Sequence, residues 1–237
     1  GGGIAYGGSD GGRVRVARAD IRNLTLDSNL QDGLEINSST PPVFDEISSI
    51  NNGAYGMRLT ANPGNLPSTL TGYANGFNGI YVTGNLGGGA PADIWSWSTV
   101  NDFPAIVANV TVSGGNTLSV VGGSVVKFVG IGSAISVTGG TLHSPGGEPV
   151  WFTSIKDDSH GGDTNNDGSA TSPAPGDWQS VFMQNLSIFD LNNTWFAYGG
   201  ASGYANVTTT SGTMTSMNWN GGGLMGSGND GARVHPS

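Results

Sequence analysis

Oxygen-bearing side chains gather between residues 154 and 178, in the segment SIKDDSHGGDTNNDGSATSPAPGDW, and this segment has the strongest potential for chemistry. Ca²⁺ takes about six to eight oxygen ligands, and a chain that curls around the ion delivers alternate side chains inward. Asp163, Asn165 and Asp167 have that spacing, and Gly168 follows where a sharp bend is needed. The predicted calcium ligands are Asp157, Asp158, Asp163, Asn165, Asp167, Ser169 and Asp177.

The closing ligand of this loop departs from the EF-hand pattern. Ala174 stands where that pattern has its last acidic residue, so either Asp177 or the pair Asp157 and Asp158 must complete the set of ligands. A solvated acidic turn without a metal is the alternative. So many carboxylates in one short loop would repel one another, which favours a bound cation.

Candidates for catalysis are few. Glycoside hydrolysis needs two carboxylates on one face, about 5–5.5 Å or about 6.5–9.5 Å apart, and calcium-assisted lysis needs a basic residue near the metal. Asp102 and Asp190 have no acidic neighbour in the sequence, and Lys156 is interpreted as a charge-balancing partner of the loop. The absence of cysteine excludes a thiol nucleophile, and the lone His160 offers no tetrahedral zinc site. We therefore predict no catalytic residue.

The tryptophans support an alternative function, in which the chain binds or cleaves carbohydrate. Aromatic rings that share an exposed face can stack on sugars. Trp95 and Trp97 alternate in DIWSWST and should lie on one side of a strand. Trp151 and Trp178 flank the acidic loop and are expected to cover its base.

The elements that position the loop are predicted from a repeat in the first third of the chain. Gly33, Gly56 and Gly79 are spaced 23 residues apart. Apolar residues recur nine positions before each glycine, directly after it and two positions further on: Leu24, Ile47 and Leu70; Leu34, Met57 and Ile80; Ile36, Leu59 and Val82. This pattern predicts short strands that stack coil upon coil, with one face in a common core.

Polar residues repeat with the same period. Asn29, Asn52 and Asn75 stand four residues before the glycines, and we expect their amides to form a hydrogen-bonded ladder from coil to coil. Two outward columns place opposite charges on neighbouring coils, Glu35 with Arg58 and Arg22 with Asp45. Such exposed pairs indicate surface ladders rather than catalytic groups.

Composition agrees with a solenoid of strands, because Gly makes up 42 of the 237 residues and charged residues only 11%. A leucine-rich repeat is the competing architecture, since IRNLTLDSN fits its strand and asparagine turn. The next coils place Ser49 and Gly72 where that repeat needs core leucines. The predicted fold class is therefore all-β: a right-handed parallel β-helix with coils of about 23–25 residues and one long acidic loop.

We expect one domain over residues 1–237, as a fragment of a longer repetitive chain. A possible subdivision gives asparagine-ladder coils at 1–86, an excursion at 87–105 and strand-rich coils at 106–237 that contain the calcium loop 154–178. IAYGGSDGGRVRV, from Ile4, resembles FAYGGASGYANV, from Phe196, which lies 192 residues later. This similarity suggests that a larger unit begins again near Phe196.

The net charge of −9 argues against nucleic acid as a partner, and no apolar run is long enough to predict a membrane span. The stretch from SVVGGSVVKF through LHSPGGEPVWFTSIKDDSHGGDTNNDGSATSPAPGDW resembles a segment of large secreted bacterial proteins of the right-handed parallel β-helix, or pectate-lyase-like, class. Those proteins share its FTS-K-DD turn, its GGDTN-DG loop and the closing PGDW.

That resemblance implies a secreted or cell-surface location and a structural or adhesive role. We therefore expect a non-catalytic extracellular solenoid stabilised by Ca²⁺. Its expected partners are further copies of itself or neighbouring repeats of the same chain, assembled end to end into a filament or surface layer. Polysaccharide is the alternative partner.

Overall fold

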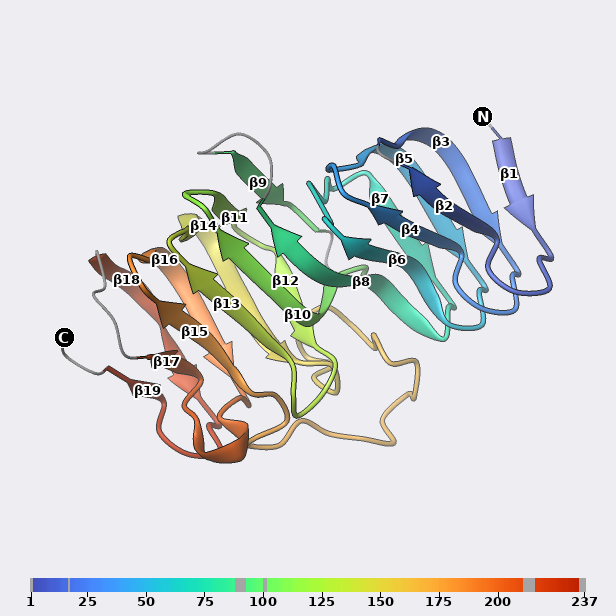
Figure 1. Ribbon diagram of the computed structural model, residues 1–237. Coiled ribbons are helices and arrows are strands. Elements are labelled where there is room, and N and C mark those ends of the chain that lie inside the picture. The colour runs from blue at the N-terminus through green and yellow to red at the C-terminus, as the bar shows by residue number, and fades with distance from the viewer. Residues whose placement is uncertain (1, 17, 88–92, 100–101, 211–215, 235–237) are drawn as a thin grey trace.

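The protein is a parallel β-solenoid of about nine turns, as seen in a computed structural model that describes residues 2–16, 18–87, 93–99, 102–210 and 216–234. The coils stack along one axis, with the two chain ends at opposite ends of the stack (Figure 1). Strands make up 55% of the structure and helix 1%. The predicted all-β parallel solenoid is confirmed, and the leucine-rich alternative, which needs more helix, is not supported.

Two sheets contain the strands, and all pairs between neighbouring coils are parallel. The four-stranded sheet contains β1 (Gly2–Ala5), β3 (Asp20–Asp27), β5 (Val43–Ile50) and β7 (Leu70–Tyr73). The 15-stranded sheet begins with β2 (Gly12–Val16), β4 (Leu34–Ser38), β6 (Tyr55–Ala61), β8 (Phe77–Leu86), β9 (Ile94–Trp97) and β10 (Ala105–Ser113). It continues with β11 (Thr117–Val120), β12 (Val125–Phe128), β13 (Ala134–Thr138), β14 (Thr141–Ser154), β15 (Ser180–Gln184), β16 (Ile188–Ala197), β17 (Val207–Thr209), β18 (Ser216–Met225) and β19 (Ala232–Arg233). The short helix η1 (Ala201–Gly203) lies between β16 and β17.

The 23-residue repeat sets the register of the first coils. Leu34 pairs with Met57, which pairs with Ile80, and all three side chains are buried. The glycine before each of them is required by close approach: a Cβ at Gly33 or Gly56 would lie 2.5 Å from its nearest neighbour. The obstacle is the backbone oxygen of Gly56 for Gly33, and the buried ring of Phe103 for Gly56.

The predicted asparagine ladder is present and buried (Asn29 2% exposed, Asn52 1%, Asn75 0%). The Asn29 amide donates to Asn52 Oδ1 at 2.7 Å, and the Asn52 amide donates to Asn75 Oδ1 at 2.8 Å. The backbone N–H groups of Asn29 and Asn52 donate to the same two oxygens at 3.1 and 3.0 Å. Each rung therefore satisfies both the side chains and the turn that holds them.

One of the two predicted charge columns forms its predicted ion pair: Arg22 lies opposite Asp45 on the next coil, and its Nη1 is 3.8 Å from Asp45 Oδ2. In the other column Glu35 lies opposite Arg58 on the next coil, yet it accepts from Arg13 Nε on the preceding coil at 2.6 Å. Arg58 instead pairs with Asp32 and lies over the rings of two tyrosines. Asp32 occupies the turn before β4, a place that strand periodicity does not reveal.

The segment expected to leave the solenoid, 87–105, contributes to it where it is described. β9 pairs with β11 in parallel, and Trp95 and Trp97 both lie in the core, on one side of the strand as predicted. β8 pairs directly with β10, so the stack continues across this segment. In the described part of the chain no helix is long and apolar enough to cross a membrane.

Candidate metal centre

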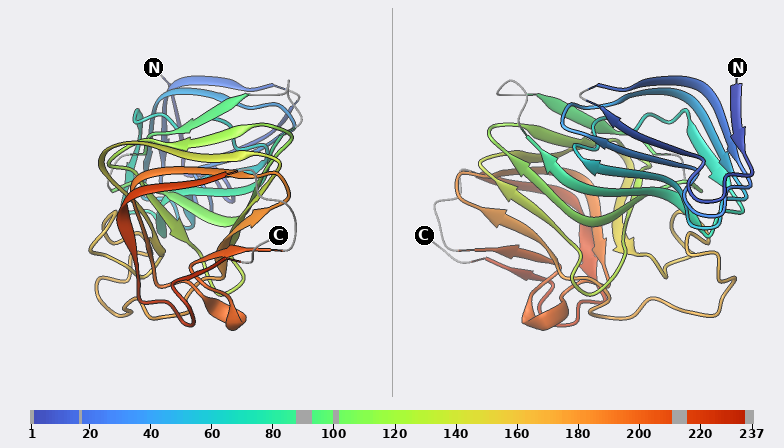
Figure 2. Two further views of the ribbon diagram at one scale, coloured as in Figure 1. Left: turned by 90° about the vertical axis from the view of Figure 1, so that its left-hand side faces the viewer. Right: turned by 45° about the vertical axis from the view of Figure 1, so that its right-hand side comes forward.

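The acidic loop is an insertion into one turn of an otherwise regular coil. Five residues lie between Phe128 and Ala134, whereas 25 lie between Ser154 and Ser180, the residues that pair with them on the next coil. The added chain extends from the end of β14 along the outside of the stack toward the N-terminal coils (Figures 1 and 2). One turn thus reaches several neighbouring coils.

Three of the seven predicted ligands come together in this loop. Carboxylate oxygens of Asp158, Asp163 and Asp167 lie within 4.8 Å of one another. Asp163 accepts the backbone N–H groups of Asp167 and Gly168 at 3.1 and 2.9 Å, which curls the chain around its carboxylate. Gly168 has a φ of 73°, so the bend needs a residue without a side chain. Asn165 lies inside this curl.

Oδ1 of Asp158 is buried at the cluster and has no hydrogen-bond donor among the described residues. Such an atom is costly unless a cation or a donor satisfies it. Asn165 turns its amide nitrogen toward the cluster, donating to Asp167 Oδ2 at 2.6 Å, so the hard ligands available to Ca²⁺ are the carboxylates of Asp158, Asp163 and Asp167. The residues present therefore fit the predicted ion.

The electrostatics of Asp158 point in the same direction. Burial raises the pKa of its carboxyl, and the neighbouring Asp163 carboxylate raises it further. A divalent cation between the two groups would remove that repulsion and favour the ionised form. Asp158 is thus the member of the cluster for which a cation makes the largest difference.

The other predicted ligands have different surroundings. Asp157 is 2% exposed; burial alone would raise the pKa of its carboxyl, but hydrogen bonds from Ser159, Thr153 and His160 outweigh burial and lower it. Asp177 accepts from Lys156 Nζ at 2.8 Å and from Ser154 Oγ at 2.7 Å. Ser169 is exposed at the tip of the loop.

The charge-balancing interpretation of Lys156 agrees with its ion pair to Asp177. Asp157 and Asp177 therefore hold the two ends of the loop on the solenoid. The remaining three carboxylates, of Asp158, Asp163 and Asp167, are those arranged to hold a cation.

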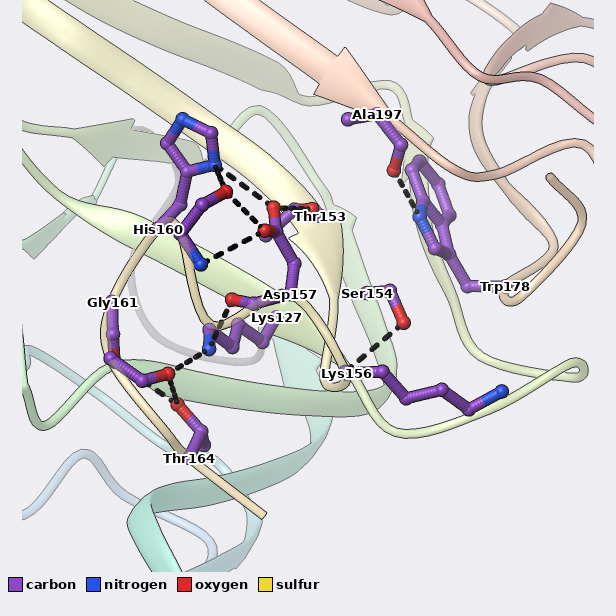
Figure 3. A network of polar contacts seen from close by, with 12 residues as sticks. Lys127, Thr153, Ser154, Lys156, Asp157, His160, Gly161, Thr164, Trp178 and Ala197 are labelled. Carbon is purple, nitrogen blue, oxygen red and sulfur yellow. Dashed lines mark hydrogen bonds and ion pairs between the residues drawn. The ribbon is translucent and has the colours of Figure 1, made fainter. Parts of the chain in front are cut away.

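Lys127, which was not predicted as a site residue, lies under the loop and is completely buried. Val126 and Phe128 point into the core, so Lys127 points outward from β12, where the loop covers it. Its ammonium donates to the backbone oxygens of Asp157 at 2.9 Å and Gly162 at 2.7 Å (Figure 3). Burial lowers the pKa of Lys127 to about 8, although the surrounding carboxylates oppose that change. A lone lysine in an apolar strand, SVVKFVG, was the only available signal.

The asparagine ladder is connected to the loop beyond its last rung, Asn75, through Asn78. Asn75 donates its backbone N–H to Asn78 Oδ1 at 2.8 Å, and the Asn78 amide donates to the backbone oxygen of Asp163 at 3.2 Å. The Asn78 N–H donates to Thr164 O at 2.7 Å. The curl that holds the carboxylates is thereby bonded to a coil about 85 residues away in the sequence.

A cleft of about 520 Å³ lies beside the loop, lined in part by Asp102, Glu148, Trp151, Asp158 and His160. Trp151 contacts the loop as predicted, because its ring lies 3.6 Å from that of His160. Its other neighbour is Trp195, whose ring stacks at 5.2 Å. Trp178, expected to cover the loop, lies in the core instead and stacks on Phe128 at 4.0 Å.

Comparison of the chain with protein-family models, curated proteins and solved structures found no match. The fold and the site therefore rest on the sequence and on the geometry described above.

Proposed function

We propose that this chain is a non-catalytic structural or adhesive solenoid of the cell surface or the extracellular space, and that its acidic loop binds Ca²⁺. The observation that supports it most is the convergence of Asp158, Asp163 and Asp167 within 4.8 Å in a loop bonded to distant coils. A cation there would fasten an insertion that otherwise concentrates negative charge. The secreted location and the relation to pectate-lyase-like β-helices rest on the resemblance of the loop alone.

The role of the ion would be mechanical. Calcium supplies positive charge and oxygen coordination, and the chain supplies the curl from Asp163 to Gly168 and the attachment through Lys127 and Asn78. Ligands that meet only in the folded state make ion binding a source of folding free energy. The solenoid would then be stiffer and more resistant to unfolding where calcium is abundant.

Chemical unfolding with calcium and with a chelator tests this proposal. At a calcium concentration 100 times the dissociation constant, the free energy of unfolding should rise by about 2.7 kcal/mol. Asp158→Asn is the sharpest variant, because none of the hydrogen bonds identified around the cluster uses its carboxylate. It should lose the gain from calcium while remaining at least as stable as the parent in chelator.

Asp45→Asn is a matched control, since it removes the same charge from a surface column away from the loop. It should keep the full response to calcium. An unfolding midpoint that calcium leaves unchanged in the parent chain would refute the metal site.

Polysaccharide binding is a second candidate, and the cleft of about 520 Å³ with Trp151 and three carboxylates favours it. Retention of the chain on immobilised acidic and neutral polysaccharides measures binding, and new reducing or unsaturated ends measure cleavage. Trp151→Ala should abolish retention if the cleft is the site. Release of new ends would replace the non-catalytic proposal with an enzymatic one.

A further inference from the structure

The last described coil of the solenoid repeats the first one. Residues 221–234, GGGLMGSGNDGARV, align without a gap to residues 1–14, GGGIAYGGSDGGRV, with eight of 14 positions identical. The similar segment that begins at Phe196 lies one coil earlier, because Phe196 pairs with Leu224, and it has no counterpart of Asp10 or Arg13. The period of the larger unit is therefore 220 residues rather than the 192 expected from Phe196.

The two segments also have the same structure. β1 and β2 flank the turn in the first coil, and β18 and β19 flank the matching turn in the last. Arg13 pairs with Asp10 at 2.6 Å, and Arg233 pairs with Asp230 at 2.7 Å, in the same relative positions. Ile4 in the first coil and Leu224 in the last both pack against the core from the end of the stack.

The first and last described coils differ in whether a further coil packs against them in the direction of the C-terminus. The first coil is covered by the next one, because Leu26 pairs with Ile4 and Ile36 pairs with Val14. Glu35 of that coil also accepts from Arg13. In the described chain, no strand pairs with the outer edges of β18 and β19. Val234, the counterpart of Val14, is 53% exposed.

We propose that the free edge of β18 and β19 binds a coil of the kind formed by residues 20–38, contributed by a further copy of the 220-residue repeat in the same chain. That coil would place a leucine on Leu224, an isoleucine on Val234 and a glutamate beside Arg233. It would also pair the open strand edges, which exposed sheets otherwise leave free for aggregation. The proposal is independent of calcium.

Charge favours this occupant over a separate copy stacked end to end. A separate copy that stacked its first described coil, residues 2–16, in register on the last coil would bring its Arg13 against Arg233 and its Asp10 against Asp230. Like charges opposite each other destabilise a strand pair, whereas the coil 20–38 supplies the alternating charge already seen between Arg13 and Glu35.

An extended chain tests the proposal, with residues 15–86 fused directly after Val234 so that the 220-residue register continues. Hydrogen exchange of the β18 and β19 amides should slow at least about tenfold, because they become interior strands. The matched control carries Leu26→Asp and Ile36→Asp in the appended copy only, and should leave these amides as exposed as in the parent chain. Equal exchange in the extension and its control would overturn the proposal.

A double-mutant cycle then tests the register. Arg233→Ala and Glu35→Ala of the appended copy should have coupled effects on the unfolding midpoint, which independent sites would not show. Additive effects would contradict the predicted register. Association of the unextended parent chain that protects β18 and β19 would also overturn the proposal, in favour of a second copy on that edge.

Discussion

The asparagine ladder and the acidic loop solve the same problem in different ways. Both must satisfy polar groups that leave water when coils stack. In the ladder, each amide bonds to the identical amide one coil away, and the contact recurs from Asn29 to Asn75. In the loop, each contact is made once, by different partners: Lys127 with two carbonyl oxygens, and Asp157 with a threonine and a histidine.

Repeated contacts give stability without specificity, whereas contacts that are made only once can form a site. A ladder needs only one residue type at one spacing, so it has no position that differs from the rest. The loop brings three carboxylates within 4.8 Å of one another, and no other part of the described chain does so. If a ligand binds this solenoid through carboxylates, the irregular turn is the place for it.

The largest expected effect comes from breaking the ladder in its middle. Asn52→Ala should lower the free energy of unfolding by about 3 kcal/mol or more, because it removes several hydrogen bonds among buried groups. The backbone N–H of Asn29 loses its acceptor, the Asn29 amide loses its bond to Asn52 Oδ1, and Asn75 Oδ1 keeps only the backbone N–H of residue 52. Urea unfolding followed by circular dichroism measures the loss.

Asn220→Ala is the control for this prediction, since Asn220 is an exposed strand asparagine with one weak contact at 3.3 Å. Its effect should stay within about 0.5 kcal/mol. A loss of similar size in both variants would mean that the ladder contributes no more than a surface amide does.

The ladder could be predicted because its contact repeats: equal spacing of Asn29, Asn52 and Asn75 is visible in the sequence, and vertical stacking follows from the solenoid. The loop could be predicted only as a group of ligand types. Which carboxylates converge depends on where the turn points each one. Asp157 and Asp158 are adjacent in the sequence but have different surroundings. Asp157 accepts a hydrogen bond from Thr153, whereas Asp158 lies in the carboxylate cluster.

Lys127 could not be assigned to the loop for a related reason. Strand alternation shows that it points outward from β12, but not that a segment 30 residues further along covers it. The pairing of Arg58 with Asp32 could not be predicted for the same reason, because Asp32 lies in a turn and strand register places only strand residues. A contact that an irregular segment makes only once leaves no repeating pattern in the sequence.

A smaller effect is expected where ladder and loop meet. Asn78→Ala should cost about 1.5 kcal/mol, because the Asn75 N–H loses its acceptor and the backbone oxygen of Asp163 loses a donor. The loop should also open more often, which limited proteolysis between residues 157 and 176 would detect. Faster cleavage without any loss in the ladder coils would show that the two regions are energetically separate.

The smallest effect concerns pH and belongs to the loop alone. The folded chain releases the Lys127 proton at a pKa of about 8, whereas the unfolded chain keeps it up to the ordinary lysine pKa of 10.5. Between these values the unfolded state binds more protons, so raising the pH favours the folded state, and the gain is lost again as pH falls toward 8. From pH 7 to 9 in chelator, the free energy of unfolding should rise by about 1 kcal/mol relative to Lys127→Met, which has no proton to release. Urea titrations of both proteins at the two pH values measure the difference. Parallel pH profiles would mean that the Lys127 ammonium stays charged beneath the loop over this pH range. The nearby carboxylates, which the ladder lacks, would then outweigh the effect of burial on its pKa.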